Sequence, residues 1–171
     1  MLKKLSAKLS FSARGFTLIE LLVVLGILGI LAIALLAAIN PVEQLNKAQD
    51  ASLENVATEY VDASVQYYSV HNEFPWDAGC FSGTVSGSHL SPDLTTCTQT
   101  LIAEGELKST FTNASNLTKI FVTNAVGTSQ VSACFLPQSN SIKNNTNTKY
   151  NSDGSVNASC PGANTCYWCA E

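Results

Sequence analysis

The most reactive-looking pattern in the sequence is a pair of cysteines near its C-terminal end. Cys166 and Cys169 have the C-x-x-C spacing of thiol–disulfide oxidoreductases. In those enzymes the motif opens a helix after a strand, whereas no βαβ pattern surrounds it here. A zinc site with Cys160 would need a fourth ligand, and neither His71 nor His89 is close in sequence. We therefore expect structural disulfides, with no redox or metal site.

All six cysteines lie beyond residue 79, in a region rich in Ser, Thr and Asn. An even number of cysteines in such a region indicates disulfides that form outside the cytoplasm. Because residues i and i+3 of a strand face opposite sides, Cys166 and Cys169 should have different partners. The pairs that we predict are Cys80 with Cys97, Cys160 with Cys166, and Cys134 with Cys169.

Other motifs that could carry chemistry are weak. Asp153-Gly154 is a hairpin-turn signal, and the surrounding residues do not complete a calcium-binding loop. No G-x-S-x-G, phosphate-binding or dinucleotide-binding motif is present, so we expect neither an enzyme nor a cofactor. N-x-S/T sequons indicate solvent-facing loops and begin at Asn113, Asn116, Asn144 and Asn157.

Charge is unevenly distributed along the chain. Nine basic and thirteen acidic residues give a formal net charge of −4. Four of the basic residues lie within residues 1–15, and the other five are single, scattered lysines. The acidic remainder offers no footprint for phosphates, so we do not expect a nucleic-acid partner. With 46% apolar and 13% charged residues, the chain should fold as one unit with an appendage.

A long apolar segment follows the basic N-terminus. Residues 21–39 contain no charge and would form a helix of about 28 Å, which matches the hydrocarbon core of a bilayer. Basic residues precede the segment and acidic residues follow it, which predicts a cytoplasmic N-terminus. A signal peptide cleaved after Ala34 is the alternative, but the apolar run continues where a polar region is expected.

Glu20 lies within this apolar stretch. An acidic group embedded in a bilayer costs about 2–3 kcal/mol, and less near the interface. Glu20 either marks the start of the span or serves a function that compensates this cost. A cationic amine nearby would neutralise it.

The sequence RGFTLIELL at residues 14–22, followed by the apolar run, closely resembles the leader and N-terminus of type IV prepilins and pseudopilins. The resemblance implies that a prepilin peptidase cuts after Gly15 and methylates the new amine of Phe16. It also implies that Glu20 meets the terminal amine of a neighbouring subunit in a filament. A small residue at the cut lets extended backbone enter a peptidase site, which suits glycine.

Small residues in the apolar segment favour close packing of helices. Gly26 and Gly29 are costly in a lone anchor but useful in a bundle. Gly29 matches a glycine of many pilins, whereas the proline that often follows eight residues later is Ala37 here. The nearest proline is Pro41, where we expect a kink.

Beyond Pro41 the pattern becomes that of an amphipathic helix. Apolar residues recur at spacings of three and four, and others widen the stripe: Leu53, Val56, Tyr60, Ala63 and Tyr67, with Val61, Val65 and Tyr68. We predict one kinked helix from Phe16 to about Val70, ending at Asn72 before Pro75. This helix end also resembles that of pilins, with Glu73 in place of the usual glycine.

Residues 76–171 should form a globular head. A helix at 98–111 is expected to break at Gly105. β-Branched and aromatic residues between turn signals predict a four-stranded antiparallel sheet from residues 119–124, 130–136, 149–151 and 165–170.

The sequence thus predicts an α+β, pilin-like protein. Its parts are a leader that is removed (1–15), a membrane or filament-core helix (16–40), an amphipathic helix (41–75) and a disulfide-bonded head (76–171). The resemblance implies a pilus subunit whose partners are prepilin peptidase and other pilins. It implies an inner-membrane precursor and then a cell-surface or periplasmic filament. A pseudopilin of a type II secretion or DNA-uptake apparatus, and a membrane-anchored binding module or enzyme, remain alternatives.

Overall fold

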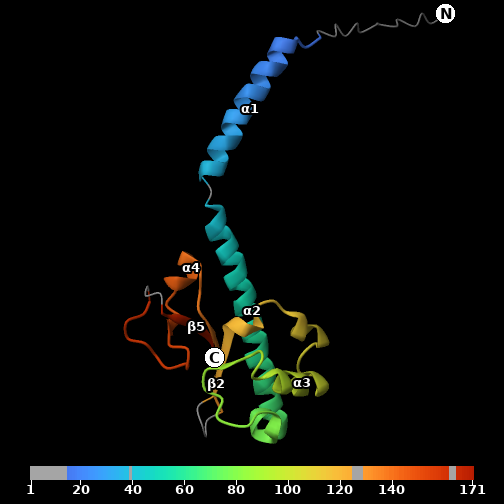
Figure 1. Cartoon of the computed structure of the whole chain (residues 1–171), viewed down its shortest axis with the longest axis vertical. Coiled ribbons are helices and arrows are strands. Elements are labelled where there is room, and N and C mark those ends of the chain that lie inside the picture. Colours follow the sequence, from blue (N-terminus) through green and yellow to red (C-terminus); the bar gives the residue numbers. More distant parts are fainter. Residues whose placement is uncertain (1–14, 39, 125–128, 162–164) are drawn as a thin grey trace, which may run out of the picture. The chain divides into compact units, whose positions relative to one another are not determined.

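A computed structural model describes residues 15–38, 40–124, 129–161 and 165–171. Contacts divide the chain into two units, Met1–Asn40 and Pro41–Glu171. The predicted leader, apart from Gly15, lies outside the described residues. The elements are drawn in Figure 1, and the protein is α+β.

The described part of the first unit forms a helix, α1, at Leu18–Ala38. It is the only helix in the described parts of the chain that is long and apolar enough to cross a membrane. None of the residues Leu18–Leu36 is buried within its own unit. Its unit supplies no tertiary packing for this helix, and its Ile, Val and Gly residues give it only a moderate intrinsic helix propensity.

The second unit begins with α2, at Pro41–His71. The sequence predicts a single kinked helix across this region, but the structure has two helices, with Asn40 outside both. Pro41 has no backbone N–H to bond to a preceding turn, whereas its fixed φ suits the first position of a helix. Pro41 consequently starts α2 instead of kinking a continuous helix.

The buried face of α2 follows the predicted stripe, with one exception. Tyr60 is fully buried at its centre, and Leu53, Ala63 and Tyr67 are buried as well. Val65, which was expected to widen the stripe, is 46% exposed. Five residues correspond to about 140° around a helix, so Val65 points away from the direction of Tyr60.

The end of α2 is formed by the residues that the sequence indicates. Asn72 has a left-handed φ of 58° and donates its N–H to the Tyr68 carbonyl at 2.8 Å. A short π-helical turn at Trp76–Cys80 follows. The Phe74 ring lies 4.7 Å from that of Tyr68 and 4.8 Å from that of Trp76, so three aromatic rings close this end of the core.

A second helix, α3, packs against α2. It spans Thr95–Ala103, and Gly105 follows with a φ of 84°. A 3₁₀ turn at Ser109–Asn113 continues the segment, so the predicted break at Gly105 is present. Phe111 from this turn reaches Tyr60, with 6.1 Å between ring centroids.

The sheet has five antiparallel strands in the order β1-β2-β3-β5-β4. The strands are β1 (Ser88–His89), β2 (Ile120–Asn124), β3 (Val131–Phe135), β4 (Thr148–Tyr150) and β5 (Tyr167–Ala170), with the single turn α4 (Asn140–Lys143) before β4. The sequence predicted four strands and missed β1. A strand of this length is too short to show an alternation of apolar and polar residues. The C-terminal strand β5 lies between β3 and β4.

One face of the sheet packs against α2, mainly through β3 and β5. Ile120, Val122 and Phe135 are fully buried in this main core. A smaller cluster contains Tyr150 and the cysteines at positions 134 and 169. Because successive side chains of a strand point to opposite faces, β3 places Phe135 in the main core and Cys134 in the smaller cluster.

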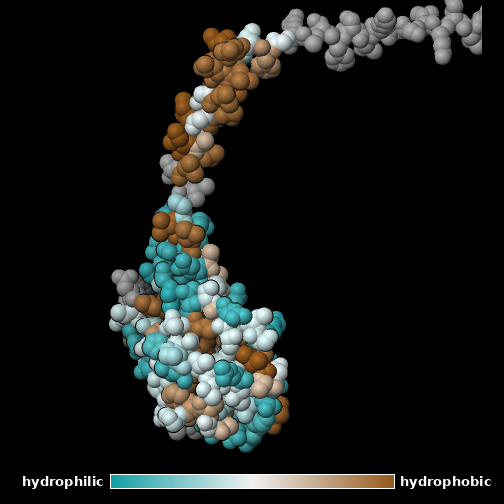
Figure 2. Space-filling view, turned by 45° about the vertical axis from the view of Figure 1, so that its right-hand side comes forward, coloured by the Kyte–Doolittle hydropathy of each residue, from teal (hydrophilic) through white to brown (hydrophobic). Residues whose placement is uncertain are grey.

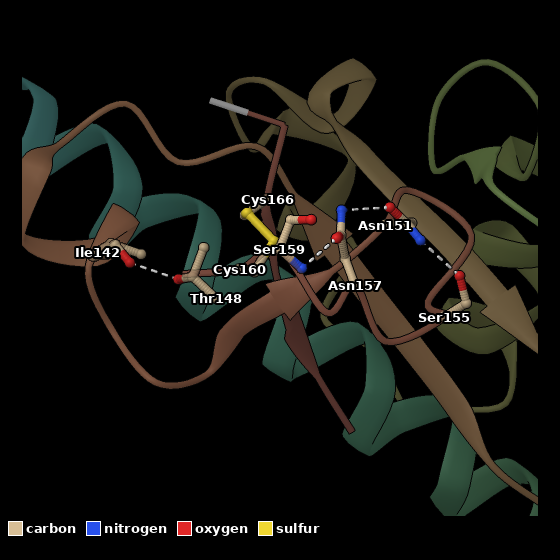
Figure 3. Close-up of a disulfide and its surroundings, with 8 residues drawn as sticks. All are labelled: Ile142, Thr148, Asn151, Ser155, Asn157, Ser159, Cys160 and Cys166. Carbon is tan, nitrogen blue, oxygen red and sulfur yellow. Dashed lines mark hydrogen bonds between the residues drawn. A yellow bond between two sulfur atoms is a disulfide. The ribbon is translucent and has the colours of Figure 1, made fainter. Parts of the chain in front are cut away.

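Three disulfides join the head, in the pairs expected from the sequence: Cys80–Cys97, Cys134–Cys169 and Cys160–Cys166. Cys134 and Cys169 are directly opposite each other on β3 and β5. The Cys160–Cys166 bond closes a small loop near Asn157, whose amide group binds Asn151 at 3.0 Å (Figure 3). Cys97 lies in the main core and the Cys134–Cys169 bond lies in the smaller cluster, so two of the three disulfides crosslink buried parts of the head.

Candidate processing and assembly site

The predicted cleavage site lies outside helix α1. Gly15, Phe16 and Thr17 are not helical, and the Phe16 side chain is 80% exposed. A methyl group built at Gly15 would meet nothing within 4 Å. Among the described residues, nothing packs against Gly15, and the bond between Gly15 and Phe16 lies outside the helix, as access by a peptidase requires.

A reciprocal set of hydrogen bonds starts α1. The Thr17 backbone N–H donates to Glu20 Oε2 at 2.8 Å, and the Thr17 hydroxyl donates to the same oxygen at 2.7 Å. The Glu20 backbone N–H in turn approaches Thr17 Oγ1 at 3.3 Å. This is a capping box, in which the N-cap and N3 residues satisfy each other's backbone donors.

Thr17 is the functional residue that the sequence reasoning missed. Thr17 and Glu20 have the T-x-x-E spacing before an apolar run, which is the sequence signature of a capping box. The charge of Glu20 within the apolar run predicted compensation by a nearby cationic amine or a position at the start of the span. The structure shows that two donors of its own chain already bind the carboxylate.

Beyond its first turn, α1 exposes apolar side chains on all sides. Leucine, isoleucine and valine side chains between residues 18 and 36 are about half exposed or more within the unit. Figure 2 shows hydrophobic residues over the visible side of α1. A helix that is apolar all round requires lipid or other helices as its surroundings. The helix therefore fits a membrane-anchored precursor.

The predicted assembly residues do not form one cluster. Gly26 and Gly29 lie about 60° apart around α1, while Gly29 is about 180° from Glu20. A methyl group at either glycine would meet nothing within 4 Å. Pro41 belongs to the other unit, where it starts α2. The acid and the glycines consequently face different directions.

In the head, two carboxylates of α2 bind backbone amides of the segment before α4. The fully buried Asp50 accepts from Gln138 and Ser139, and Glu43 accepts from Asn140 at 2.9 Å. Asp50 and Glu43 are seven residues apart, so they share one side of α2. Sequence gave no signal for these contacts, because the partners are 88 to 97 residues apart.

Titratable side chains elsewhere in the head form pairs. His71 Nε2 lies 4.0 Å from a Glu104 carboxylate oxygen, and His89 Nδ1 lies 3.4 Å from Asp93 Oδ2. Among the residues that the structure describes, no group of three or more His, Cys, Asp or Glu side chains could hold a metal ion.

Comparison with known proteins adds information on the N-terminal part. The sequence profile described as the prokaryotic N-terminal methylation motif matches residues 11–36. No curated protein and no solved structure matches the chain. The matched residues include the predicted cleavage site, the capping box and most of α1. The chain therefore carries the N-terminal prepilin motif shared by type IV pilins and pseudopilins.

Proposed function

We propose that this protein is a structural subunit of a type IV pilus-like filament. It is made as a prepilin, cleaved after Gly15, methylated on the amine of Phe16 and assembled through α1. The observation that carries this proposal is a processing motif joined directly to an apolar helix that its own unit leaves uncovered.

The apolar surface of α1 must be covered by lipid or by other helices. Because lipid is as apolar as these side chains, exchanging lipid for neighbouring helices depends on close packing between the helices. Lipid surrounds the helix in the precursor, with residues 1–15 on the cytoplasmic side of the inner membrane. In the filament, at the cell surface or in the periplasm, neighbouring copies of α1 replace the lipid, and Gly26 and Gly29 permit close approach.

Cleavage creates the cation that Glu20 needs for intersubunit pairing. The new α-amine of Phe16 is positively charged near neutral pH, and a buried ion pair is tolerated only with good geometry and additional hydrogen bonds. An amine from one copy and Glu20 from another would offset each other's desolvation. Such a pair would also fix the register between subunits.

The same motif supports a pseudopilin of a secretion or DNA-uptake apparatus. The two systems differ in where fibres occur, since a pilus extends from the cell and a pseudopilus stays within the envelope. Fibres sheared from intact cells favour the pilus. Fibres recovered only after the envelope is opened favour the pseudopilus.

The decisive experiment uses the full chain in the cells that produce it. Surface fibres are sheared, imaged by electron microscopy and analysed by mass spectrometry of the N-terminus. We expect fibres whose subunit begins with N-methylated Phe16, no cleavage in Gly15→Leu, and processed but unassembled protein in Glu20→Ala. A working protein that keeps residues 1–15 and stays monomeric would contradict the proposal.

A further inference from the structure

We propose that a hollow at the C-terminal end of α2 binds a neutral sugar. The hollow has a volume of about 380 Å³ and is lined by the last turn of α2 and the turn after it, by the loop at residues 83–85 and by the end of β2. Sites for small molecules in proteins have volumes of this order. The proposal concerns the head alone and adds a binding role to the structural one.

The buried part of the lining includes a hydrogen-bond donor that lacks an acceptor. Trp76 is 5% exposed, and its indole Nε1 has no hydrogen-bond partner among the described residues. An indole N–H can only donate, and buried donors in folded proteins are almost always paired with protein, water or a ligand. Because Trp76 lines the hollow, a molecule bound there supplies the missing acceptor.

The exposed part of the lining has the opposite hydrogen-bonding capacity, because it carries two carboxylates. Glu73 and Asp77 are both exposed, and the Phe74 backbone N–H donates to Asp77 Oδ2 at 3.4 Å. Among the described residues that line the hollow, none is Lys, Arg or His. Two negative charges without a basic side chain beside them repel an anion. The bound molecule therefore donates hydrogen bonds and carries no negative charge.

A hydroxyl group is the ligand group that satisfies both parts of the lining. It donates to a carboxylate and accepts from an indole N–H, whereas an ammonium group only donates and an ionised carboxylate only accepts. Several hydroxyl groups on one ring, with apolar C–H groups between them, are the chemistry of a sugar. The half-buried Tyr68 adds an aromatic ring to the lining, and aromatic surface combined with a few polar groups suits such a ligand.

Contacts within the head hold the lining in place. The Phe74 ring stacks on that of Trp76, with 4.8 Å between the centroids and 15° between the planes. The Asn124 backbone N–H donates to the Val85 carbonyl at 2.8 Å, which fixes the loop against the end of β2. A site that is already formed loses less conformational entropy when it binds its ligand.

The hollow lies at the opposite end of α2 from Pro41. The helix has 31 residues and is about 46 Å long, and α1 precedes its N-terminal end in the chain. Assembly through α1 therefore does not require that the hollow be covered.

The test follows the indole N–H resonances of both tryptophans by nuclear magnetic resonance. Isotopically labelled full-length protein is held in micelles of a polyoxyethylene detergent, whose head group is not a sugar. It is titrated with the methyl glycosides of glucose, galactose, mannose and N-acetylglucosamine, and with glucuronate and choline. We expect at least one glycoside to shift the Trp76 resonance saturably at millimolar concentration. Trp168 does not line the hollow and is the internal control, and Trp76→Phe identifies the Trp76 resonance by its loss.

A matched pair of glutamate variants locates the bound sugar. Glu73→Ala removes a charged acceptor from the hollow and should weaken binding of the same glycoside about fivefold. Glu59→Ala removes an exposed glutamate of α2 that does not line the hollow, and it should leave the affinity unchanged. Because both side chains are exposed, neither variant should prevent folding. Glucuronate should bind more weakly than methyl glucoside, since its carboxylate meets those of Glu73 and Asp77.

Three results overturn the inference. If no glycoside shifts the Trp76 resonance at tens of millimolar, the hollow does not bind sugars. Equal affinity of the wild type and Glu73→Ala would place the sugar outside the hollow. Tighter binding of choline or glucuronate than of every methyl glycoside would assign the hollow to a charged ligand. Each of these results leaves the proposed function standing, because fibre assembly is measured separately.

Discussion

Asp50 and Ser139 form the shortest contact between α2 and the segment before α4. The Ser139 backbone N–H donates to Asp50 Oδ2 at 2.7 Å, and the N–H of Gln138 donates to both oxygens at 3.0 Å. Asp50 is fully buried, so water does not replace these bonds. The carboxylate thereby ties the C-terminal part of the head to α2 across 89 residues of sequence.

Replacing Asp50 should destabilise the head strongly. Asp50→Ala removes the acceptor of the buried Ser139 amide and of the Gln138 amide, and we expect a loss of about 2–4 kcal/mol in the free energy of unfolding. Glu43→Gln is the control, because Glu43 is half-buried and binds Asn140 near the surface. The control should lose less than about 1 kcal/mol.

Chemical denaturation of the full chain in detergent micelles, followed by tryptophan fluorescence, measures both variants. Trp76 and Trp168 are buried in the head, so the signal reports on this unit. Equal stability of Asp50→Ala and the wild type would show that the two amides find other acceptors.

Elements that are determined by residues close together in the sequence could be predicted from local patterns. The stripe from Leu53 to Tyr67 has a helical period, and Asn72 with Pro75 provides a stop signal. The Thr17–Glu20 capping box also has a local signature. The charge of Glu20 in an apolar run predicts a cationic partner and does not by itself indicate Thr17.

Contacts between distant segments had no such signature. Asp50 lies on the buried side of α2, but nothing near it in sequence indicates that amides of residues 138 and 139 are its partners. The two-residue strand β1 exists because it pairs with Phe121 and Val122 of β2, and periodicity cannot reveal so short a strand. A proline can either kink a continuous helix or begin a new one. The residue type at position 41 therefore did not predict which of the two the structure has.

The disulfides should contribute unequally to the stability of the head. Loop-closure entropy grows with the number of residues enclosed, and the separations are 35 for Cys134–Cys169, 17 for Cys80–Cys97 and 6 for Cys160–Cys166. Replacing both cysteines of a pair by alanine should destabilise by about 4, 3 and 2 kcal/mol in that order. Denaturation midpoints of the three double variants test the ranking, and a larger effect for the smallest loop would contradict it.

The pKa of the Asp153 carboxyl group should depend measurably on Ser155. Hydrogen bonds from the Ser155 hydroxyl and N–H, at 2.6 and 3.0 Å, lower the pKa of Asp153. A lowered pKa in the folded state stabilises above the pKa of the unfolded chain, and this contribution is lost as the pH falls through the folded value. Ser155→Ala should therefore raise the pKa of Asp153 and weaken the acid dependence of stability.

Nuclear magnetic resonance titration of the Asp153 carboxyl group measures this change. Ser152→Ala is the matched control, since it lies in the same turn and no contact of its hydroxyl with Asp153 is present in the described structure. An unchanged Asp153 titration in Ser155→Ala would show that the hydroxyl bond is not maintained in solution.

Gly154 should resist substitution for two separable reasons. Its φ of 77° is unfavourable for residues with a side chain, and a methyl group there would lie 2.5 Å from Thr123 Cγ2. Gly105 has a φ of 84° but no atom within 4 Å of such a methyl group, so it isolates the backbone effect. We expect Gly105→Ala to destabilise by about 1 kcal/mol and Gly154→Ala by about 2–4 kcal/mol. Adding Thr123→Ser to Gly154→Ala removes the clashing methyl group and should restore stability to the level of Gly105→Ala, whereas no recovery would place the whole effect in the backbone.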